Sequence, residues 1–557
     1  MGPDASGADQ MLREESMWKR LTMATLVAVF FLVLGCQKQG HPPGVEEPIP
    51  PPAMGLHQAA LQGRIDVVQQ HIAAGSELNE KDAYGSTPLI IAVTFGKVDV
   101  ASALIEAGAD LEIGNNEGST PLHIAALFGR REIVAALLGK GANRHARNNT
   151  GATAFDIVAA PFEDDRGIYD RIVSALGPLG LQLDYAQIEA ARPEIEQMLR
   201  PRPDELAGVT YAPRPGTDWK VSTPAEQGLD PLLVAELYYD AAALETLYGL
   251  LVIKDGRLIA EGYFNEGAME QPALLQSVTK SYTSALVGIA LDEGCLRSLD
   301  QKLLDFFPEY ADKVTDPRKK QITIRNLLQM RAGYPWEEAR PGGWDALLSG
   351  DYLPLMVEFP LTADPGAEFQ YSNVSSHLLG VIVARACETD IKSFAQEHLF
   401  SPTGVEVGDW TKDRYGYYFG HAELYLTARN AAKLGLLYLG GGTYEGNQVV
   451  PARWVEASLR RYSTDVSSAG IQAGKVGRYF RDVGYGYQWW AARVGDHDFN
   501  LAWGHGGQFV IVLDELDMVI VVTSDPFRGQ KSDAESWKHE RANLNLVGKF
   551  IRSLPAR

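Results

Sequence analysis

Cysteine is scarce in this sequence: Cys36, Cys295 and Cys387 are its three cysteines among 557 residues. A disulfide-stapled scaffold needs more of them, and no C-x-x-C or H-E-x-x-H spacing indicates a metal centre. The eleven histidines are scattered along the chain. The sequence therefore predicts neither a metal nor a cofactor.

Positive charge is also in short supply. Lysine and arginine total 51 against 71 aspartates and glutamates, a net charge of −20. Proteins that bind nucleic acid or an anionic membrane surface need basic patches, so we expect no nucleic-acid partner. The remaining composition, with 45% hydrophobic and 22% charged residues, is typical of a soluble globular protein with several domains.

The sequence has no apolar run at its N-terminus long enough for an ordinary transmembrane helix. Leu21 to Leu34 is apolar over about 14 residues, short of the roughly 20 that a spanning helix needs. Basic residues precede the run, and Val33-Leu34-Gly35-Cys36 ends it, which together indicate a secretory signal. These last four residues resemble the bacterial lipobox, although Leu34 stands where a small residue is commoner.

The lipobox resemblance implies that Cys36 is lipidated and that residues 1–36 are a lipoprotein signal peptide. An uncleaved membrane anchor is the alternative. Gln37, rather than aspartate, follows the cysteine, which in the lipobox pattern implies the outer membrane. We therefore expect a bacterial cell-envelope protein on the periplasmic side, held to the membrane by its lipid only. Residues 37–53 are rich in proline and predict an extended tether.

A repeat of 33 residues follows the tether. Glycines recur at positions 85, 118 and 151, and Ser86-Thr87-Pro88-Leu89 recurs as Ser119-Thr120-Pro121-Leu122 before His123. This pattern resembles ankyrin repeats over residues 54–160, with a truncated last unit. The resemblance implies an all-α solenoid in which His123 packs between neighbouring turns. Such a stack either binds a protein partner or serves as a spacer, and the sequence leaves both open.

Residues 161–219 predict a helical cap and linker, broken at Gly177-Pro178 and at Pro193.

Residues 220–557 predict an antiparallel sheet around a helical insertion. Strands are expected at 248–253 and 258–264, joined by an Asp-Gly turn, and again at 485–491, 499–503, 509–513 and 518–523. A long helix is expected at 534–553, and helices fill most of the interval between the two groups of strands. Strands at both ends of the region predict one α/β (α+β) domain.

Three motifs in this region carry chemistry. Ser277 and Lys280 are spaced i and i+3 before a buried helix, so the lysine amine can take the serine proton during attack on a carbonyl. Tyr371 can relay protons, and Asn373 can hold a substrate amide. The third motif is a glycine-rich turn that can admit substrate beside a strand, where the N–H groups of Gln508 and Ser277 would form an oxyanion hole. Its residues are His505, Gly506, Gly507 and Gln508.

S-x-x-K, Y-x-N and an H-x-G form of the third motif, in this order, resemble the serine hydrolases related to class C β-lactamases and penicillin-binding proteins. The 6-aminohexanoate-dimer hydrolase group and carboxylesterases are the branch most resembled. The resemblance implies Ser277 as nucleophile, Lys280 as its base and Tyr371 as general acid/base. It further implies that Asn373, His505 and the 506–508 turn position the substrate.

Two departures bear on the substrate. His505 stands where β-lactamases have a lysine that meets a substrate carboxylate, so a fixed cation is missing. His421-Ala422-Glu423 stands where relatives often have a pair of small residues, which would reshape the pocket. We expect an enzyme that cleaves small ester or amide substrates. Two alternatives remain: an ankyrin-led binding protein with a silent hydrolase domain, and a protein that binds penicillin or hydrolyses β-lactams.

Cys295 and Cys387 follow the helices that begin at the first two motifs. If those helices run side by side, a disulfide can form in an oxidising compartment. The sequence favours two buried free thiols over that pairing.

Overall fold

The computed structural model describes residues 50–214, 219–340, 342–348, 350–469, 475–528 and 533–556. Cys36, the rest of the predicted signal peptide and most of the predicted tether lie outside these ranges. Across the described ranges, no helix combines the length and the apolar character needed to cross a bilayer.

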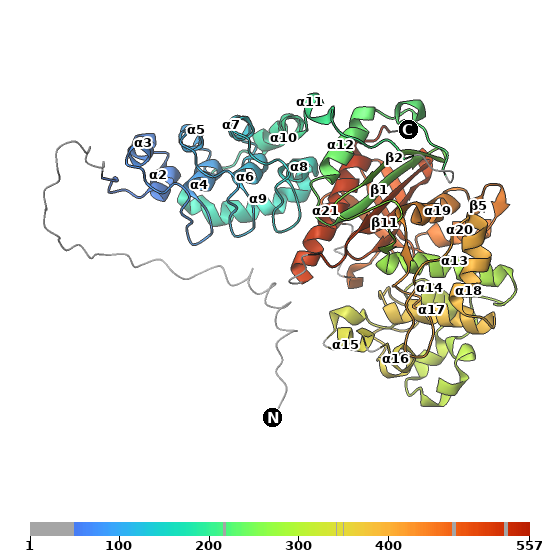
Figure 1. The fold of residues 1–557 in the computed structure, drawn as a ribbon. Helices are drawn as coiled ribbons and strands as arrows, with labels where there is room; N and C mark the ends of the chain where they lie inside the picture. The colour runs from blue at the N-terminus through green and yellow to red at the C-terminus, as the bar shows by residue number, and fades with distance from the viewer. Residues whose placement is uncertain are drawn as a thin grey trace, which may run out of the picture.

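Helix pairs stack one after another in the N-terminal part of the described chain (Figure 1). The turns before them use glycine at left-handed φ values, for example +73° at Gly85 and +71° at Gly118, which explains the 33-residue glycine period. The pairs are α2 (Leu56–Gln62) with α3 (Ile65–Ala73), α4 (Pro88–Thr94) with α5 (Val98–Glu106), and α6 (Pro121–Leu127) with α7 (Arg131–Gly139). The next helix, α8 (Ala154–Ala159), packs against α6 and α10 (Tyr185–Leu199), and α9 (Phe162–Leu176) lies between α8 and α10 in the sequence.

His123 is buried and links two neighbouring turns of the stack, as its place in the repeat predicts. Its Nδ1 lies 2.8 Å from Thr120 Oγ1, and its Nε2 lies 3.0 Å from the carbonyl oxygen of Ala152 in the next unit. Burial lowers the pKa of this imidazole to about 4, so the ring is neutral at pH 7. The structure therefore confirms the solenoid and gives His123 a packing role.

One prediction about the end of the stack is wrong. Pro193 does not break a helix, since α10 (Tyr185–Leu199) continues through it. The neighbouring Arg192 is buried and donates to the Ala160 carbonyl and to Asp165, at 2.7 Å each. These tertiary contacts offset the backbone hydrogen bond that proline cannot make.

The hydrolase region is built on one antiparallel sheet with the strand order β2-β1-β12-β11-β10-β9-β8-β7. N-terminal and C-terminal strands meet where β1 pairs with β12, from Gly249 opposite Thr523 to Lys254 opposite Met518. The structure thus confirms the predicted closure of the sheet by both ends of the region. The strands are β1 (Leu247–Lys254), β2 (Arg257–Tyr263), β7 (Lys475–Val476), β8 (Phe480–Tyr485), β9 (Trp490–Val494), β10 (His497–Gly504), β11 (Gln508–Leu513) and β12 (Met518–Ser524).

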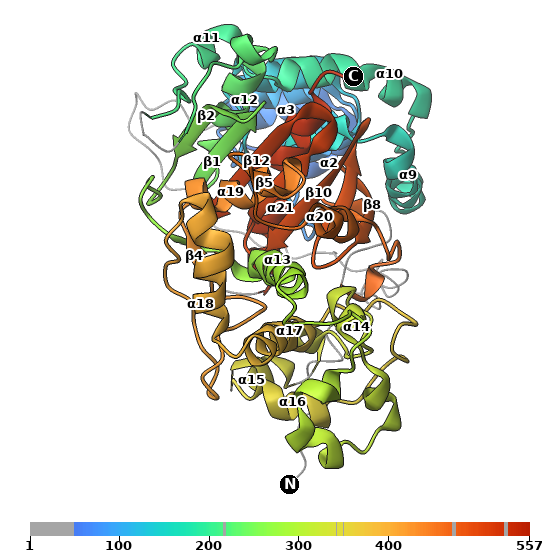
Figure 2. The ribbon, with the colours of Figure 1, turned by 90° about the vertical axis from the view of Figure 1, so that its right-hand side faces the viewer.

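Successive residues of β1 point to opposite faces of this sheet and enter two different cores. Leu250 and Val252 pack with helices α12 (Pro231–Ala241) and α21 (Asp533–Arg552). Leu251 and Ile253 pack with α13 (Thr279–Asp292) and α19 (Ala428–Leu439). Figure 2 shows α13 below the strands of the sheet and above α14 (Ile324–Leu328) and α17 (Asn373–Ala386).

The strand predicted at 485–491 is divided in the structure. β8 ends at Tyr485 and β9 begins at Trp490, with a turn between them in which Gln488 has φ +60°. The buried Gln488 side chain donates to the carbonyls of Leu327 and Leu328 and accepts a hydrogen bond from Ser376. The break in the strand therefore lets this side chain join the sheet to the helical layer.

The helical insertion packs around α13 and α17 (Asn373–Ala386). Cys295, just after α13, and Cys387, which ends α17, form a disulfide with a Cα–Cα distance of 5.0 Å. The sequence prediction of two free thiols is therefore wrong. The other elements of this layer are β3 (Ala273–Leu274), α14 (Ile324–Leu328), α15 (Gly343–Leu348), α16 (Tyr352–Glu358), α18 (Ile391–Ala395), β4 (Tyr425–Leu426), β5 (Thr443–Tyr444), β6 (Asn447–Gln448) and α20 (Ala452–Leu459).

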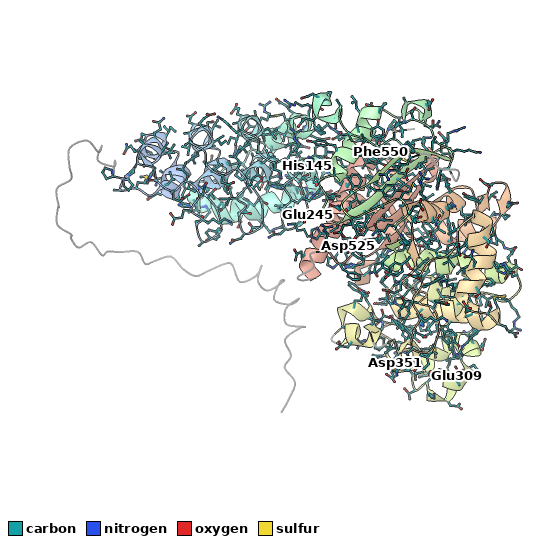
Figure 3. All side chains as sticks on the ribbon, viewed as in Figure 1. His145, Glu245, Glu309, Asp351, Asp525 and Phe550 are labelled. Atoms are coloured by element: carbon teal, nitrogen blue, oxygen red, sulfur yellow. A yellow bond between two sulfur atoms is a disulfide. The ribbon has the colours of Figure 1, made fainter. Side chains whose placement is uncertain are left out.

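The ankyrin stack docks directly on the hydrolase region. Buried residues of the stack and of α12, α21 and the sheet belong to one continuous apolar core. Tyr479 Oη donates to Asp156 at 2.8 Å, and Arg478 pairs with Asp165 at 2.9 Å. His145 lies at this junction, 3.7 Å from Asp240 of α12 (Figure 3). The stack is therefore fixed against the sheet domain by both apolar and charged contacts.

Candidate active site

Ser277 lies in a 3-10 turn, η3 (Gln276–Val278), that continues into the buried helix α13. Gln276, directly before it, has φ +49°, a left-handed conformation that is costly for a residue other than glycine. The preceding residues Ala273–Leu274 pair with β4, which holds the entry to the turn. The chain therefore turns sharply at Ser277 and presents its hydroxyl beside the first helical residues.

Lys280 lies one turn after Ser277 and is almost completely buried, with 1% of its surface exposed. Its Nζ donates to Ser277 Oγ at 2.8 Å, to Asn373 Oδ1 at 2.8 Å and to the His421 carbonyl at 3.0 Å. Burial lowers the pKa of the amine to about 7, against the opposing effect of the carboxylates of Glu338 and Glu337. A substantial fraction of Lys280 is thus neutral near pH 7 and able to accept a proton.

Tyr371 lies over the same amine, with Lys280 Nζ 5.1 Å from the centre of its ring. The ring also stacks on Trp490 of β9, at 5.6 Å between centres. Burial raises the pKa of the phenol, while a hydrogen bond with Ser277 opposes that rise. Tyr371 is therefore a protonated phenol in contact with the serine, suited to donate a proton rather than to stand as a phenolate.

Both ends of the Asn373 amide are engaged by protein groups. Its Oδ1 accepts from Lys280, and its Nδ2 donates to Glu338 Oε1 at 2.8 Å. In the described structure this side chain orients the lysine, whereas the sequence predicted contact with substrate.

Glu337 and Glu338 are site residues that the sequence reasoning missed. Glu337 is fully buried and accepts from Ser372 Oγ at 2.6 Å and from the Asn373 and Val374 N–H groups at the start of α17. Burial raises the pKa of this carboxyl to about 7, although these hydrogen bonds act in the opposite direction. Glu337 caps the start of α17 from a position 36 residues before Asn373. An ordinary N-cap residue stands next to its helix and can be recognised in the sequence, whereas a cap from a distant segment cannot.

The third motif forms the tight turn between β10 and β11, where Gly504 pairs with Gln508. Gly506 and Gly507 have φ +80° and +89°, so both need the freedom of glycine. A Cβ atom on Gly506 would lie 2.5 Å from Pro526 Cα, and one on Gly507 would overlap Asn543. These glycines therefore allow close packing of the protein on itself, in addition to any room that they leave for substrate.

Gln508 presents only its backbone to the site. Its buried side chain donates to Ser524 O at 2.7 Å and to Ser524 Oγ at 3.0 Å, which ties β11 to β12. The η3 turn that carries Ser277 contacts both β10 and β11, and a Cβ on Gly504 would overlap the carbonyl of Leu275. The Ser277 turn and the start of β11 are thus neighbours, as an oxyanion hole from their N–H groups requires.

His505 is half-exposed beside this turn, and Glu540 of α21 is its partner. The His505 Nδ1 lies 3.1 Å from Glu540 Oε2, and 37% of the histidine side chain is exposed. Sequence reasoning missed Glu540, because the contact joins two segments that no motif connects. His421 is buried beside Lys280, which donates to its carbonyl, and its Nε2 lies 2.9 Å from the Tyr352 hydroxyl. Among the described residues, no cluster of three or more His, Cys, Asp or Glu could hold a metal ion.

Comparison with known proteins identifies two families in this chain. A beta-lactamase family model matches residues 244–544, and an ankyrin-repeat model matches residues 56–148. The 6-aminohexanoate-dimer hydrolase of Paenarthrobacter ureafaciens is 28% identical over 292 residues, which cover 49% of this chain and 71% of that protein. Beta-lactamase-like protein 2 of Dictyostelium discoideum is 24% identical over 194 residues, 34% of this chain and 33% of its own length.

Among solved structures, a mutant of the simvastatin synthase of Aspergillus terreus is 16% identical, with a TM-score of 0.45 over 58% of this chain and 99% of that one. The beta-lactamase match itself spans more than half of the 557 residues and includes Ser277, Tyr371 and His505. The chain therefore belongs to the beta-lactamase family of serine hydrolases and carries ankyrin repeats on the N-terminal side of that domain.

Proposed function

We propose that this protein cleaves ester or amide bonds through an acyl-enzyme on Ser277. The observation that carries the proposal is the 2.8 Å contact between Ser277 Oγ and Lys280 Nζ, in a place where burial lowers the lysine pKa to about 7. A lysine with its ordinary pKa is protonated at neutral pH and cannot serve as a base.

Acylation begins when neutral Lys280 accepts the Ser277 proton as Oγ attacks the substrate carbonyl carbon. The carbonyl electron pair moves to oxygen, and the N–H groups of Ser277 and Gln508 stabilise the resulting oxyanion. Collapse of this intermediate re-forms the carbonyl and breaks the bond to the leaving group. Tyr371 donates its phenolic proton to the departing oxygen or nitrogen and regains a proton from the Lys280 ammonium.

Deacylation runs through the same groups in the reverse direction. A proton of the attacking water passes to Tyr371 while the phenolic proton passes to Lys280, whose amine is neutral again, and the water oxygen bonds to the acyl carbon. The second tetrahedral intermediate breaks the bond to Ser277 Oγ, which takes back a proton. The products are a carboxylic acid and the free serine, so each cycle consumes one water.

The surroundings of His505 support a substrate without a carboxylate at that position. When the imidazole is protonated, its charge is shared with Glu540, 3.1 Å away. A paired cation attracts a substrate anion less than an isolated lysine does. We therefore propose neutral esters or amides as the substrate class. The relative from Paenarthrobacter ureafaciens, named as a hydrolase of the 6-aminohexanoate dimer, supports the amide part of this class.

The proposal includes a location and a protein partner. The lipobox-like residues around Cys36 support a lipid anchor on the periplasmic side of the outer membrane. Labelled palmitate should then be incorporated into the wild-type protein, and Cys36→Ala should abolish incorporation.

The ankyrin stack supports a protein partner, because Tyr84 stands exposed on a turn between two helix pairs.

The decisive experiment is intact-mass labelling of the full-length chain with a fluorophosphonate. We expect one adduct on the wild type and none on Ser277→Ala. Ser281→Ala is the matched control, since Ser281 lies on the same helix but donates to the Gln488 carbonyl at 2.7 Å. Absence of an adduct on folded wild-type protein would refute the enzyme proposal and favour the ankyrin-led binding alternative. A stable adduct with penicillin would favour the penicillin-binding alternative.

A further inference from the structure

Glu540 is a buried carboxylate in the middle of α21, with 1% of the residue exposed. Its Oε1 accepts a hydrogen bond from Trp503 Nε1 at 2.8 Å. Its Oε2 accepts from the Gly506 N–H at 2.8 Å and lies 3.1 Å from His505 Nδ1. A carboxylate is costly to bury unless donors surround it, and here the donors all come from β10 and the turn that follows it.

These contacts act on the two parts of the third motif that the proposed reaction uses. In the neutral imidazole, a proton on His505 Nδ1 is the form that can donate to Glu540, so the carboxylate selects that tautomer. The hydrogen bond from Gly506 fixes the turn two residues before Gln508, whose N–H belongs to the proposed oxyanion hole. Asn543, one helical turn after Glu540, donates to the Gly506 carbonyl at 3.2 Å and so holds the peptide unit that follows in the same turn.

We propose that Glu540 is a positioning residue of the active site, which sets the orientation and tautomer of His505 and holds the Gly506 turn in place for oxyanion binding. The inference rests on the proposed function of Ser277. Carboxylate–histidine pairs orient imidazoles in this way in other active sites and metal sites.

The same turn of α21 is held from its other side by the ankyrin stack. Arg541, the next residue, donates from Nε to the Thr150 carbonyl at 3.0 Å. The backbone of Gly151 lies so close to the helix that a Cβ there would stand 2.5 Å from the Lys538 carbonyl. The docked stack therefore supports the position from which Glu540 reaches the active site.

The test is a double-mutant cycle on the full-length protein with Glu540→Gln, His505→Gln and the double variant. The readouts are kcat and KM for p-nitrophenyl butyrate and the rate of fluorophosphonate labelling. We expect Glu540→Gln to lower kcat by about 10- to 100-fold, the range typical for loss of an orienting partner. The double variant should lose less activity than the product of the two single losses predicts, because part of the effect of Glu540 passes through the His505 side chain.

Glu535→Gln removes the same charge from the same helix and is the matched control. Glu540→Asp should restore part of the rate, since it retains the carboxylate, and it serves as the second variant should Glu540→Gln fail to fold. Losses that simply add in the double variant, or a Glu540→Gln rate equal to wild type, would overturn the positioning role. If the wild-type protein is not labelled by the fluorophosphonate and does not hydrolyse the ester, the proposed function of Ser277 is refuted. That outcome differs from an active wild type with an unaffected Glu540→Gln variant, which refutes only the positioning role.

Discussion

Glu540 and Arg541 are consecutive residues of α21, and their side chains bind two different parts of the protein. Glu540 accepts a hydrogen bond from the Gly506 N–H in the active-site turn, whereas Arg541 donates one to the Thr150 carbonyl of the ankyrin stack. One helical turn thus lies between the solenoid and the third motif. A change at the docking surface should consequently be felt in the rate of hydrolysis, although the stack supplies none of the motif residues.

Gly151→Ala tests this coupling. The added methyl group would stand 2.5 Å from the Lys538 carbonyl, so the stack and α21 must move apart. We expect ester hydrolysis to fall by up to about tenfold, because small displacements of positioning groups are costly in rate. Gly141→Ala is the matched control, since Gly141 has a similar left-handed φ of +85° but no atom within 4 Å of its Cβ position. Equal rates for the two variants would contradict the coupling.

The rate of acylation should depend on pH through Lys280. Its pKa is lowered to about 7, and only the neutral amine can accept the serine proton. Labelling by fluorophosphonate should therefore rise as pH increases through about 7 and level off above it. Lys280→Arg keeps a cation that does not deprotonate, so labelling should fall by about 10³-fold or more at every pH. A wild-type profile that is flat between pH 5.5 and 8.5 would count against Lys280 as the base.

Glu338→Gln should move that profile to lower pH. The Glu338 carboxylate raises the pKa of Lys280, opposing the effect of burial, and its replacement by a neutral amide removes this contribution. A glutamine can still accept the hydrogen bond from Asn373 Nδ2, so the geometry of the site is preserved. The measurement is the pH midpoint of fluorophosphonate labelling for the two proteins side by side. An unchanged midpoint, or one displaced upward, would be inconsistent with this electrostatic role.

The disulfide between Cys295 and Cys387 should contribute to stability. It closes a loop with a sequence separation of 92, and its removal should lower the free energy of unfolding by about 2–5 kcal/mol. Denaturant titration with and without a thiol reductant would measure the difference. A variant with both cysteines replaced by serine should match the reduced wild type and should not respond to the reductant. Equal stability of oxidised and reduced protein would show that the bond has no such effect.

Sequence periodicity was sufficient for features that depend on local backbone geometry. The 33-residue glycine spacing predicted the solenoid, because each turn needs a left-handed residue such as Gly85. The i, i+3 spacing predicted that Lys280 would stand beside Ser277, since a helical turn brings those positions together. Apolar runs and the Asp-Gly turn predicted most strands, but not the break at Gln488, whose side chain binds a different layer.

The tertiary structure decided every contact between segments that no local rule connects. It brought Glu337 to the start of α17, paired Cys295 with Cys387 where free thiols were expected, and carried α10 through Pro193. It also placed Glu540 against His505 and the ankyrin stack against α21. The sequence by itself thus determined the fold family and the order of the three motifs. The supporting contacts around those motifs arose only when distant segments packed together, because a spacing along the chain fixes distance only within one helix, hairpin or repeat.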